Sequence, residues 1–245
     1  MDLVIVRENT EGFYADRNMY DGCGEFSPIP GVGLSLRKIT KEASLKIAES
    51  AFEIAKSRSI NQTKKSKVHV VHKANVMKIT DGIFLDACRN ISSKYNDIDC
   101  EEMLVDACAA HLVRKPEQFD VILTTNMFGD ILSDLATELS GSLGLAGSLN
   151  AGNKYAMAQA QHGAAPDIAE KNIANPISLI LSSAMLLDWL GKKRRSEKLI
   201  LASNLINKSV LELLNYKENF TNDLGGKAST NKTTENLTKI LTNLI

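Results

Sequence analysis

Short apolar runs recur along the chain and predict the strands of a sheet. Residues 3–6 read Leu-Val-Ile-Val, and residues 119–124 form a second, nearly continuous apolar run. Such runs are typical of strands that are covered on both faces. Further strands are predicted at residues 34–39, 67–72 and 102–105. The stretch 16–33 is rich in Gly, Asp, Asn and Pro, which predicts a loop.

Between the strands, apolar positions recur at helical spacing. Thr40 is placed to cap the first of these helices, and Pro176 follows Asn175 at the start of a later one. Helices are predicted at residues 41–57, 81–94, 128–139, 175–191, 193–214 and 229–244. Strands that alternate with helices imply an α/β fold.

Composition and charge mainly exclude function classes. The 245 residues can form one large domain or two small ones. Lys+Arg and Asp+Glu both number 29, and a net charge of zero argues against binding to nucleic acid or to an anionic membrane. No apolar run reaches membrane-spanning length, and acidic and basic residues interrupt the first apolar run of what would be a signal peptide. We therefore expect a cytoplasmic protein.

The four cysteines give little sign of a metal centre. They form no C-x-x-C pair, and Cys108 with His111 makes only a lone C-x-x-H. Reduced, mostly buried thiols are the simpler interpretation for Cys23, Cys88, Cys100 and Cys108.

Two aspartates are the first candidates for chemistry. Asp130 and Asp134 are four residues apart on a predicted helix that follows a buried strand, so both carboxylates lie on one face. Hard oxygen donors at the carboxyl end of a strand suit Mg²⁺ or Mn²⁺. Acidic residues near a helix N-terminus are also favoured by the helix dipole alone. The spacing leaves both interpretations open.

The longer stretch 126–145, with its glycine-rich end, resembles the isocitrate and 3-isopropylmalate dehydrogenase family position by position. The resemblance covers nearly the whole chain in the same order, and it implies an isopropylmalate dehydrogenase-like two-domain α/β fold. Residues 1–137 would form the small domain with a dimer-forming arm and the catalytic residues. Residues 138–245 would form the C-terminal part of the large, cofactor-binding domain, whose N-terminal part is missing.

Three further segments match motifs of this family. The run Arg7-Glu-Asn-Thr-Glu-Gly-Phe-Tyr14 implies that Arg7 binds a substrate carboxylate and that Tyr14 reprotonates the product carbon. Without the resemblance, a surface arginine and a half-buried tyrosine would be the simpler interpretation. Lys73 would assist removal of the substrate hydroxyl proton, and Asn75 would contact substrate or cofactor. Asp106 would complete the metal ligands with Asp130 and Asp134. Lys73 and Asp106 would reach across a homodimer interface, so that two chains share each active site.

The segment beginning His162-Gly163-Ala-Ala165-Pro resembles the family loop that wraps the adenosine half of the cofactor, and Asn175 matches an adenine contact. Asp167 would accept hydrogen bonds from a free ribose 2′-hydroxyl and repel a 2′-phosphate, which favours NAD over NADP. The implied reaction is the oxidative decarboxylation of a 2-hydroxy acid of the isocitrate, homoisocitrate or 3-isopropylmalate type.

Two departures from the family keep an alternative open. Gln159 stands where the family usually has Glu near the nicotinamide. The chain also opens almost directly on the strand at residues 3–6, and the segment with two more carboxylate-binding arginines is missing, so we interpret the chain as N-terminally truncated. The alternative is therefore an inactive fragment or a regulatory-type subunit of such a dehydrogenase.

Overall fold

The computed structural model describes residues 2–14, 24–61 and 66–245. The chain divides into two compact units, Met1–Ala136 and Thr137–Ile245. The sequence-based boundary was placed after residue 137, next to this division. Among the described residues, none of the helices is long and apolar enough to cross a bilayer.

The first unit is built on a four-stranded parallel sheet with the order β1-β6-β4-β5. These strands are β1 (Val4–Arg7), β4 (Lys67–His72), β5 (Asp99–Leu104) and β6 (Val121–Thr124). The α/β fold predicted from the alternating pattern is confirmed.

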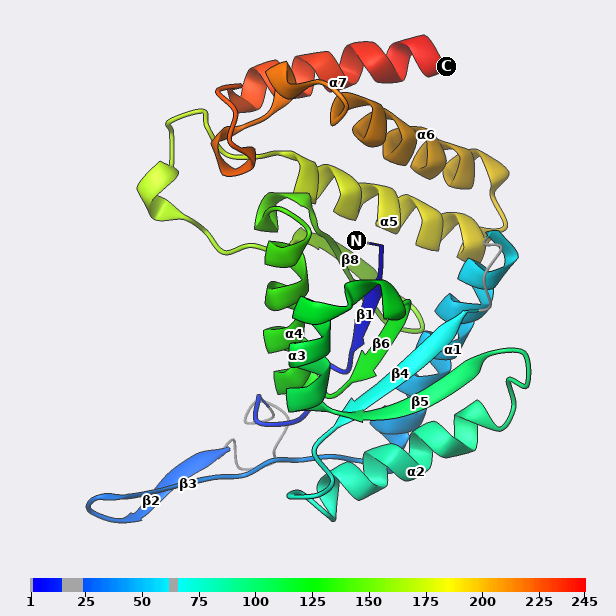
Figure 1. Ribbon diagram of the computed structural model, residues 1–245, viewed down its shortest axis with the longest axis vertical. Coiled ribbons are helices and arrows are strands. Elements are labelled where there is room, and N and C mark those ends of the chain that lie inside the picture. The colour runs from blue at the N-terminus through cyan, green and yellow to red at the C-terminus, as the bar shows by residue number, and fades with distance from the viewer. Residues whose placement is uncertain (1, 15–23, 62–65) are drawn as a thin grey trace. The chain divides into compact units, whose positions relative to one another are not determined.

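Helices cover both faces of this sheet (Figure 1). Helices α1 (Lys41–Asn61) and α2 (Thr80–Ser92) pack on one face, and α3 (Val105–Arg114) and α4 (Asn126–Leu139) pack on the other. Because successive side chains along a strand point to opposite faces of the sheet, each strand contributes residues to the cores on both faces. In β6, Val121 and Leu123 join the core under α1 and α2, whereas Ile122 joins the core under α3 and α4.

The parallel arrangement gathers the predicted catalytic residues. Parallel strands end at the same edge of a sheet, where ligands of such folds bind. Arg7 is the last residue of β1, and Lys73 follows β4. Asp106 lies in the first turn of α3 after β5, and Asn126 begins α4 after β6. Residues far apart in sequence therefore meet at this carboxyl edge.

An antiparallel hairpin, β2 (Glu25–Ile29) with β3 (Val32–Ser35), projects from the first unit (Figure 1). Every residue of both strands is exposed. The predicted loop at residues 16–33 is therefore wrong for residues 25–29 and 32–33, and residues 16–23 lie outside the described part of the chain. The strand predicted at 34–39 begins earlier and ends at Ser35, after which Lys38 forms an isolated β-bridge with Gly12.

The second unit joins a small hairpin to a helical layer. Strands β7 (Gly147–Ala151) and β8 (Ala156–Ala160) pair antiparallel, followed by α5 (Ile177–Arg194), α6 (Glu197–Leu213) and α7 (Thr230–Leu244). Two buried serines of α5 fasten the hairpin. Ser182 Oγ accepts from the Ser148 backbone N–H at 2.9 Å and donates to the Gln159 carbonyl at 2.7 Å, while Ser178 Oγ donates to the Ala146 carbonyl at 2.6 Å.

Two elements differ from the prediction for visible reasons. The helix predicted at 193–214 is interrupted because Arg195 adopts a left-handed conformation (φ 52°) that ends α5, and Ser196 precedes α6. Residue 105, predicted as strand, instead begins α3, a helix for which the apolar pattern gave no separate signal.

Candidate active site and cofactor loop

Arg7 and Asp130 form the centre of a polar cluster at the carboxyl edge of the sheet. Arg7 Nη1 donates to Asp130 Oδ1 at 2.5 Å, and Arg7 Nε donates to Asn126 Oδ1 at 2.8 Å. The guanidinium carbon lies 5.6 Å from the ring centre of Tyr14. The Arg7 side chain is 30% exposed and that of Asp130 is 47% exposed, so ligands from solvent can reach both.

The surroundings hold Arg7 in this place. The Asn126 amide donates from Nδ2 to the Glu11 carbonyl at 2.8 Å, which orients its oxygen toward Arg7. Gly129 provides room, since a Cβ there would lie 2.5 Å from Arg7 Cγ and 2.7 Å from Arg7 Cβ. A glycine in the first turns of α4 thus allows the arginine side chain to pass along the helix.

Tyr14 lies beside the same carboxylate. Its hydroxyl donates to Asp130 Oδ2 at 3.1 Å, and this hydrogen bond, aided by desolvation and by the negative charge of Asp130, raises the pKa of Tyr14. The phenol therefore stays protonated at neutral pH and keeps a proton to donate.

Lys73 and Asp106 form a second ion pair at the same edge. Lys73 Nζ donates to Asp106 Oδ1 at 2.5 Å. The hydrogen bond from Lys73 is the main cause of the lowered pKa of Asp106, whose side chain is 66% exposed. Asn75 lies exposed in the turn that follows Lys73. Lys73, which follows β4, and Asp106, which follows β5, are thus brought together as a pair.

Behind Lys73 lies a buried ion pair that the sequence analysis did not include. Asp81, fully buried in the first turn of α2, accepts from Arg37 Nη1 at 2.5 Å and from the Lys73 backbone N–H at 2.5 Å. No short-range motif links these residues, because the bonds join positions 44 and 8 apart in sequence.

The three predicted metal ligands do not converge within one chain. Across the described residues, no group of three or more His, Cys, Asp or Glu side chains is placed to hold a metal ion. Asp130 and Asp134 share a face of α4 as predicted, Asp134 is exposed, and Asp106 pairs instead with Lys73. The prediction that all three ligands serve one ion within a site shared between chains stays untested.

The predicted cofactor residues lie on one exposed loop of the second unit. His162, Gly163, Ala165 and Asp167 are exposed, and Asp167 sits in the short 3₁₀ turn Pro166–Ile168. Ala165 has a left-handed backbone (φ 44°), a conformation that costs free energy in non-glycine residues and recurs at ligand-binding loops.

Asn175 closes this loop and is fixed at both ends of its amide. Its Oδ1 accepts from the Ile177 backbone N–H at 3.0 Å, and its Nδ2 donates to Asp223 Oδ2 at 2.9 Å. Asp223 also accepts from Ser142 Oγ at 2.5 Å. Burial raises the pKa of Asp223, but hydrogen bonds from Ser142, Thr221 and Asn175 together outweigh it and hold the pKa below its usual value.

Asp223 was not among the site residues predicted from the sequence. A Cβ on Gly144 would lie 2.7 Å from both Asn175 and Asp223, so the glycine-rich end of the segment 126–145 is the sequence feature that could have indicated a close approach there.

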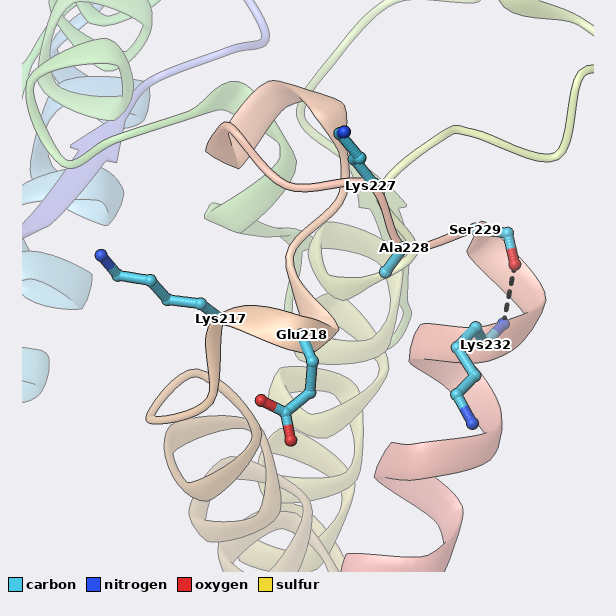
Figure 2. A pocket seen from close by; sticks show the side chains of 6 residues that line it. All are labelled: Lys217, Glu218, Lys227, Ala228, Ser229 and Lys232. Carbon is cyan, nitrogen blue, oxygen red and sulfur yellow. Dashed lines mark hydrogen bonds between the residues drawn. The ribbon is translucent and has the colours of Figure 1, made fainter.

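A pocket of about 600 Å³ elsewhere in the second unit carries none of these residues. Figure 2 shows the ammonium groups of its three lysines pointing in different directions, and Ser229 Oγ accepts from the Lys232 backbone N–H as the cap of α7. Its lining residues are Lys217, Glu218, Lys227, Ala228, Ser229 and Lys232.

Comparison with known proteins identifies the family. The sequence profile of the family described as isocitrate/isopropylmalate dehydrogenase matches residues 1–241. The isocitrate/homoisocitrate dehydrogenase of Thermus thermophilus is 43% identical over 246 residues, 100% of this chain and 67% of that protein. A regulatory subunit of the mitochondrial NAD isocitrate dehydrogenase from Dictyostelium discoideum is 42% identical over 99% of this chain and 63% of its own length.

A crystal structure of isocitrate dehydrogenase from Methylococcus capsulatus superposes with a TM-score of 0.84 at 38% identity. The match covers 98% of this chain and 67% of that one. The chain therefore spans about two thirds or less of the length of these relatives.

Proposed function

Since the chain belongs to the isocitrate/isopropylmalate dehydrogenase family, we propose that the protein oxidises and decarboxylates a 2-hydroxy acid, using NAD and Mg²⁺ or Mn²⁺. The observation that carries this proposal is the meeting of Arg7, Tyr14 and Asp130 at the carboxyl edge of the parallel sheet. The pair of Lys73 with Asp106 lies at the end of neighbouring strands of the same sheet.

The donor atoms suit the proposed groups. Asp106, Asp130 and Asp134 offer the hard carboxylate oxygens that Mg²⁺ and Mn²⁺ prefer. When bound, NAD would supply the acceptor for a hydride from C2 of the hydroxy acid, and the divalent ion would supply positive charge beside the oxygen at that carbon.

Charge balance supports a role for Arg7 in binding a substrate carboxylate. Without ligands, Arg7 and Asp130 neutralise each other at 2.5 Å. A carboxylate of the substrate can replace Asp130 as the partner of Arg7, which releases Asp130 to ligate a cation. Each charge keeps an opposite partner throughout the exchange, so neither is left unpaired in a partly buried site. This exchange makes cation binding stronger in the presence of the hydroxy acid.

The same reasoning applies to Lys73. Its ammonium group is neutralised by Asp106 at 2.5 Å. With Asp106 serving as a metal ligand, the Lys73 amine would lie beside the substrate and would assist removal of the proton of the substrate hydroxyl. Tyr14, whose raised pKa keeps it protonated, then donates its proton to the carbon from which CO₂ has left.

We propose that two chains share each site. Asp106 lies with Lys73 rather than with Asp130 and Asp134, so a second chain would have to supply it to a common cation. The β2–β3 hairpin supports a dimer, because it exposes large apolar side chains on both strands. These side chains are Phe26, Ile29, Val32 and Leu34.

Asp167 supports NAD over NADP. It is an exposed carboxylate on the loop that also carries His162 and Gly163. A carboxylate accepts hydrogen bonds from a ribose 2′-hydroxyl and repels a 2′-phosphate.

The direct test is NAD reduction by the purified protein with Mn²⁺. Isocitrate, homoisocitrate, 3-isopropylmalate, malate and tartrate are compared as substrates, each with and without a chelator. We expect metal-dependent turnover with one of the first three. Absence of turnover with every hydroxy acid, in a protein that remains folded, would contradict the proposal.

A second candidate function is that of a regulatory-type subunit. The similarity to a relative named as a regulatory subunit, at 42% identity over 99% of this chain, favours it. In that case the protein alone would be inactive and would change the activity of a catalytic family member when the two are mixed.

A further inference from the structure

The buried ion pair between Arg37 and Asp81 is placed where it can control Lys73. The side chain of Arg37 is 7% exposed and that of Asp81 is 0% exposed. One carboxylate oxygen, Oδ1, accepts from Arg37 Nη1, and the other, Oδ2, accepts from the Lys73 backbone N–H. The Lys73 backbone N–H is therefore held at the point where the chain leaves β4.

Arg37 is itself fixed from several sides. Its Nη1 also donates to Thr80 Oγ1 at 2.7 Å, and its Nη2 donates to Thr125 Oγ1 at 3.0 Å. The guanidinium carbon lies 5.9 Å from the ring centre of Phe13 and 5.6 Å from that of Phe128. Arg37 thus connects the start of α2, the end of β6 and the residue preceding Tyr14.

Stability alone is a weak reason for this pair. Desolvating two charges offsets most of their attraction, and buried ion pairs can often be replaced by apolar residues without loss of stability. The pair does supply directional bonds, which apolar residues cannot. One of those bonds joins Asp81 to the backbone N–H of Lys73, a residue placed in the proposed reaction.

We infer that Asp81 and Arg37 are positioning residues for Lys73: Asp81 fixes the backbone from which the lysine side chain reaches Asp106, and Arg37 fixes Asp81. The catalytic part of this inference rests on the proposed function. The positioning itself is a property of the folded chain, and it can be measured without turnover.

Two charge-neutral double variants separate the hydrogen bond from the ion pair. Asp81→Ala with Arg37→Met removes both charges and also the acceptor for the Lys73 N–H. Asp81→Asn with Arg37→Gln removes both charges but leaves an amide oxygen that can accept this bond. Neither variant buries an unpaired charge, which favours folding of both.

A second ion pair of the same unit provides the matched control. Arg58 Nε donates to Asp120 Oδ1 at 2.5 Å, and the Lys67 backbone N–H donates to Asp120 Oδ2 at 3.4 Å. This pair holds the first residue of β4, whereas Asp81 holds the residue after its last. Asp120→Ala with Arg58→Met therefore removes an equivalent pair at the other end of the strand.

The first readout is the rate at which acetic anhydride labels the Lys73 amine, measured by peptide mass spectrometry with the exposed Lys46 as reference. We expect the rate to rise about threefold in the Asp81→Ala pair, because a partly exposed ion pair with Asp106 is weakened. It should stay unchanged in the Asp81→Asn pair and in the Asp120→Ala control.

The second readout separates kcat from KM. In the Asp81→Ala pair we expect kcat to fall at least about tenfold, since small misplacements of a catalytic group are costly, while KM for NAD stays unchanged. Native labelling and native kcat in that variant would overturn the inference, and so would increased labelling in the Asp81→Asn pair. If the unmodified protein lacks turnover, the proposed function fails, and labelling alone still decides whether Asp81 positions Lys73.

Discussion

Gly129→Ala is a small change with a specific expected effect on the site. The new methyl group would lie 2.5 Å from Arg7 Cγ and 2.9 Å from Arg7 Cδ, whereas ordinary contacts begin at 3.4 Å. Arg7 must therefore move by about 1 Å, and misplacement of that size can cost on the order of a hundredfold in kcat/KM. We expect the loss to appear mainly as a higher KM for the hydroxy acid, with KM for NAD unchanged.

The stability change can be worked out in the same way. Overpacking costs about 1–3 kcal/mol, and replacing glycine by alanine in a helix contributes up to about 1 kcal/mol of stability. Gly82→Ala provides the matched control, because Gly82 lies in the first turn of α2 and a Cβ there meets nothing within 4 Å. The difference between the two variants in urea unfolding, about 1–3 kcal/mol, isolates the contact with Arg7.

Steady-state kinetics and urea unfolding of both variants provide the assay. If Gly129→Ala matched Gly82→Ala in stability and in KM for the hydroxy acid, the position assigned to Arg7 beside α4 would be wrong.

Two further predictions concern His69 and Asp167. Burial lowers the pKa of His69 from its usual 6.5 to about 4, so between these pH values the unfolded chain binds a proton that the folded chain does not. The free energy of unfolding should therefore fall by up to about 3 kcal/mol as the pH drops from 6.5 to 4. Urea unfolding across this pH range measures the change. If the free energy of unfolding of His69→Phe fell by as much over the same range, the assignment to His69 would be wrong. Asp167→Asn should raise kcat/KM for NADP relative to NAD about tenfold, because it removes repulsion of the 2′-phosphate. Glu170→Gln in the same loop is the control and should leave this ratio unchanged. Equal ratios in both variants would argue against the role of Asp167.

The sequence predicted β1, β4 and β6 well because these strands are largely buried and rich in apolar residues. Strand β5, predicted at residues 102–105, instead begins at Asp99, because its first residues are exposed and polar. The strand predicted at residues 67–72 matches β4 (Lys67–His72) at both ends. The exposed hairpin β2–β3 was missed, because strands without a buried face show no alternation of apolar and polar residues. Helix α3 was missed because it follows β5 without an intervening turn.

In the candidate site too, some features could be predicted from the sequence and others could not. The resemblance to the family assigned roles to Arg7, Tyr14 and Lys73, and the parallel topology explains why Arg7 and Lys73 lie at the same edge of the sheet. The supporting contacts could not be predicted, since the bond from Arg37 to Asp81 spans 44 positions and the bond from Asn175 to Asp223 spans 48. Such contacts depend on how the elements fold together rather than on any local pattern.

Paired variants test the central claim, a dehydrogenase site shared by two chains, most directly. Tyr14→Phe and Lys73→Met are each expected to be inactive as homodimers in the NAD reduction assay. A heterodimer of one Tyr14→Phe chain and one Lys73→Met chain is obtained by co-expression and purification through two different tags. If Tyr14 and Lys73 of each site come from different chains, one site of this heterodimer carries both substitutions and the other carries neither.

We expect this heterodimer to have about half the specific activity of the unmodified protein, because one of its two sites is intact. A heterodimer as inactive as its parents, beside an active unmodified protein, would contradict the shared site.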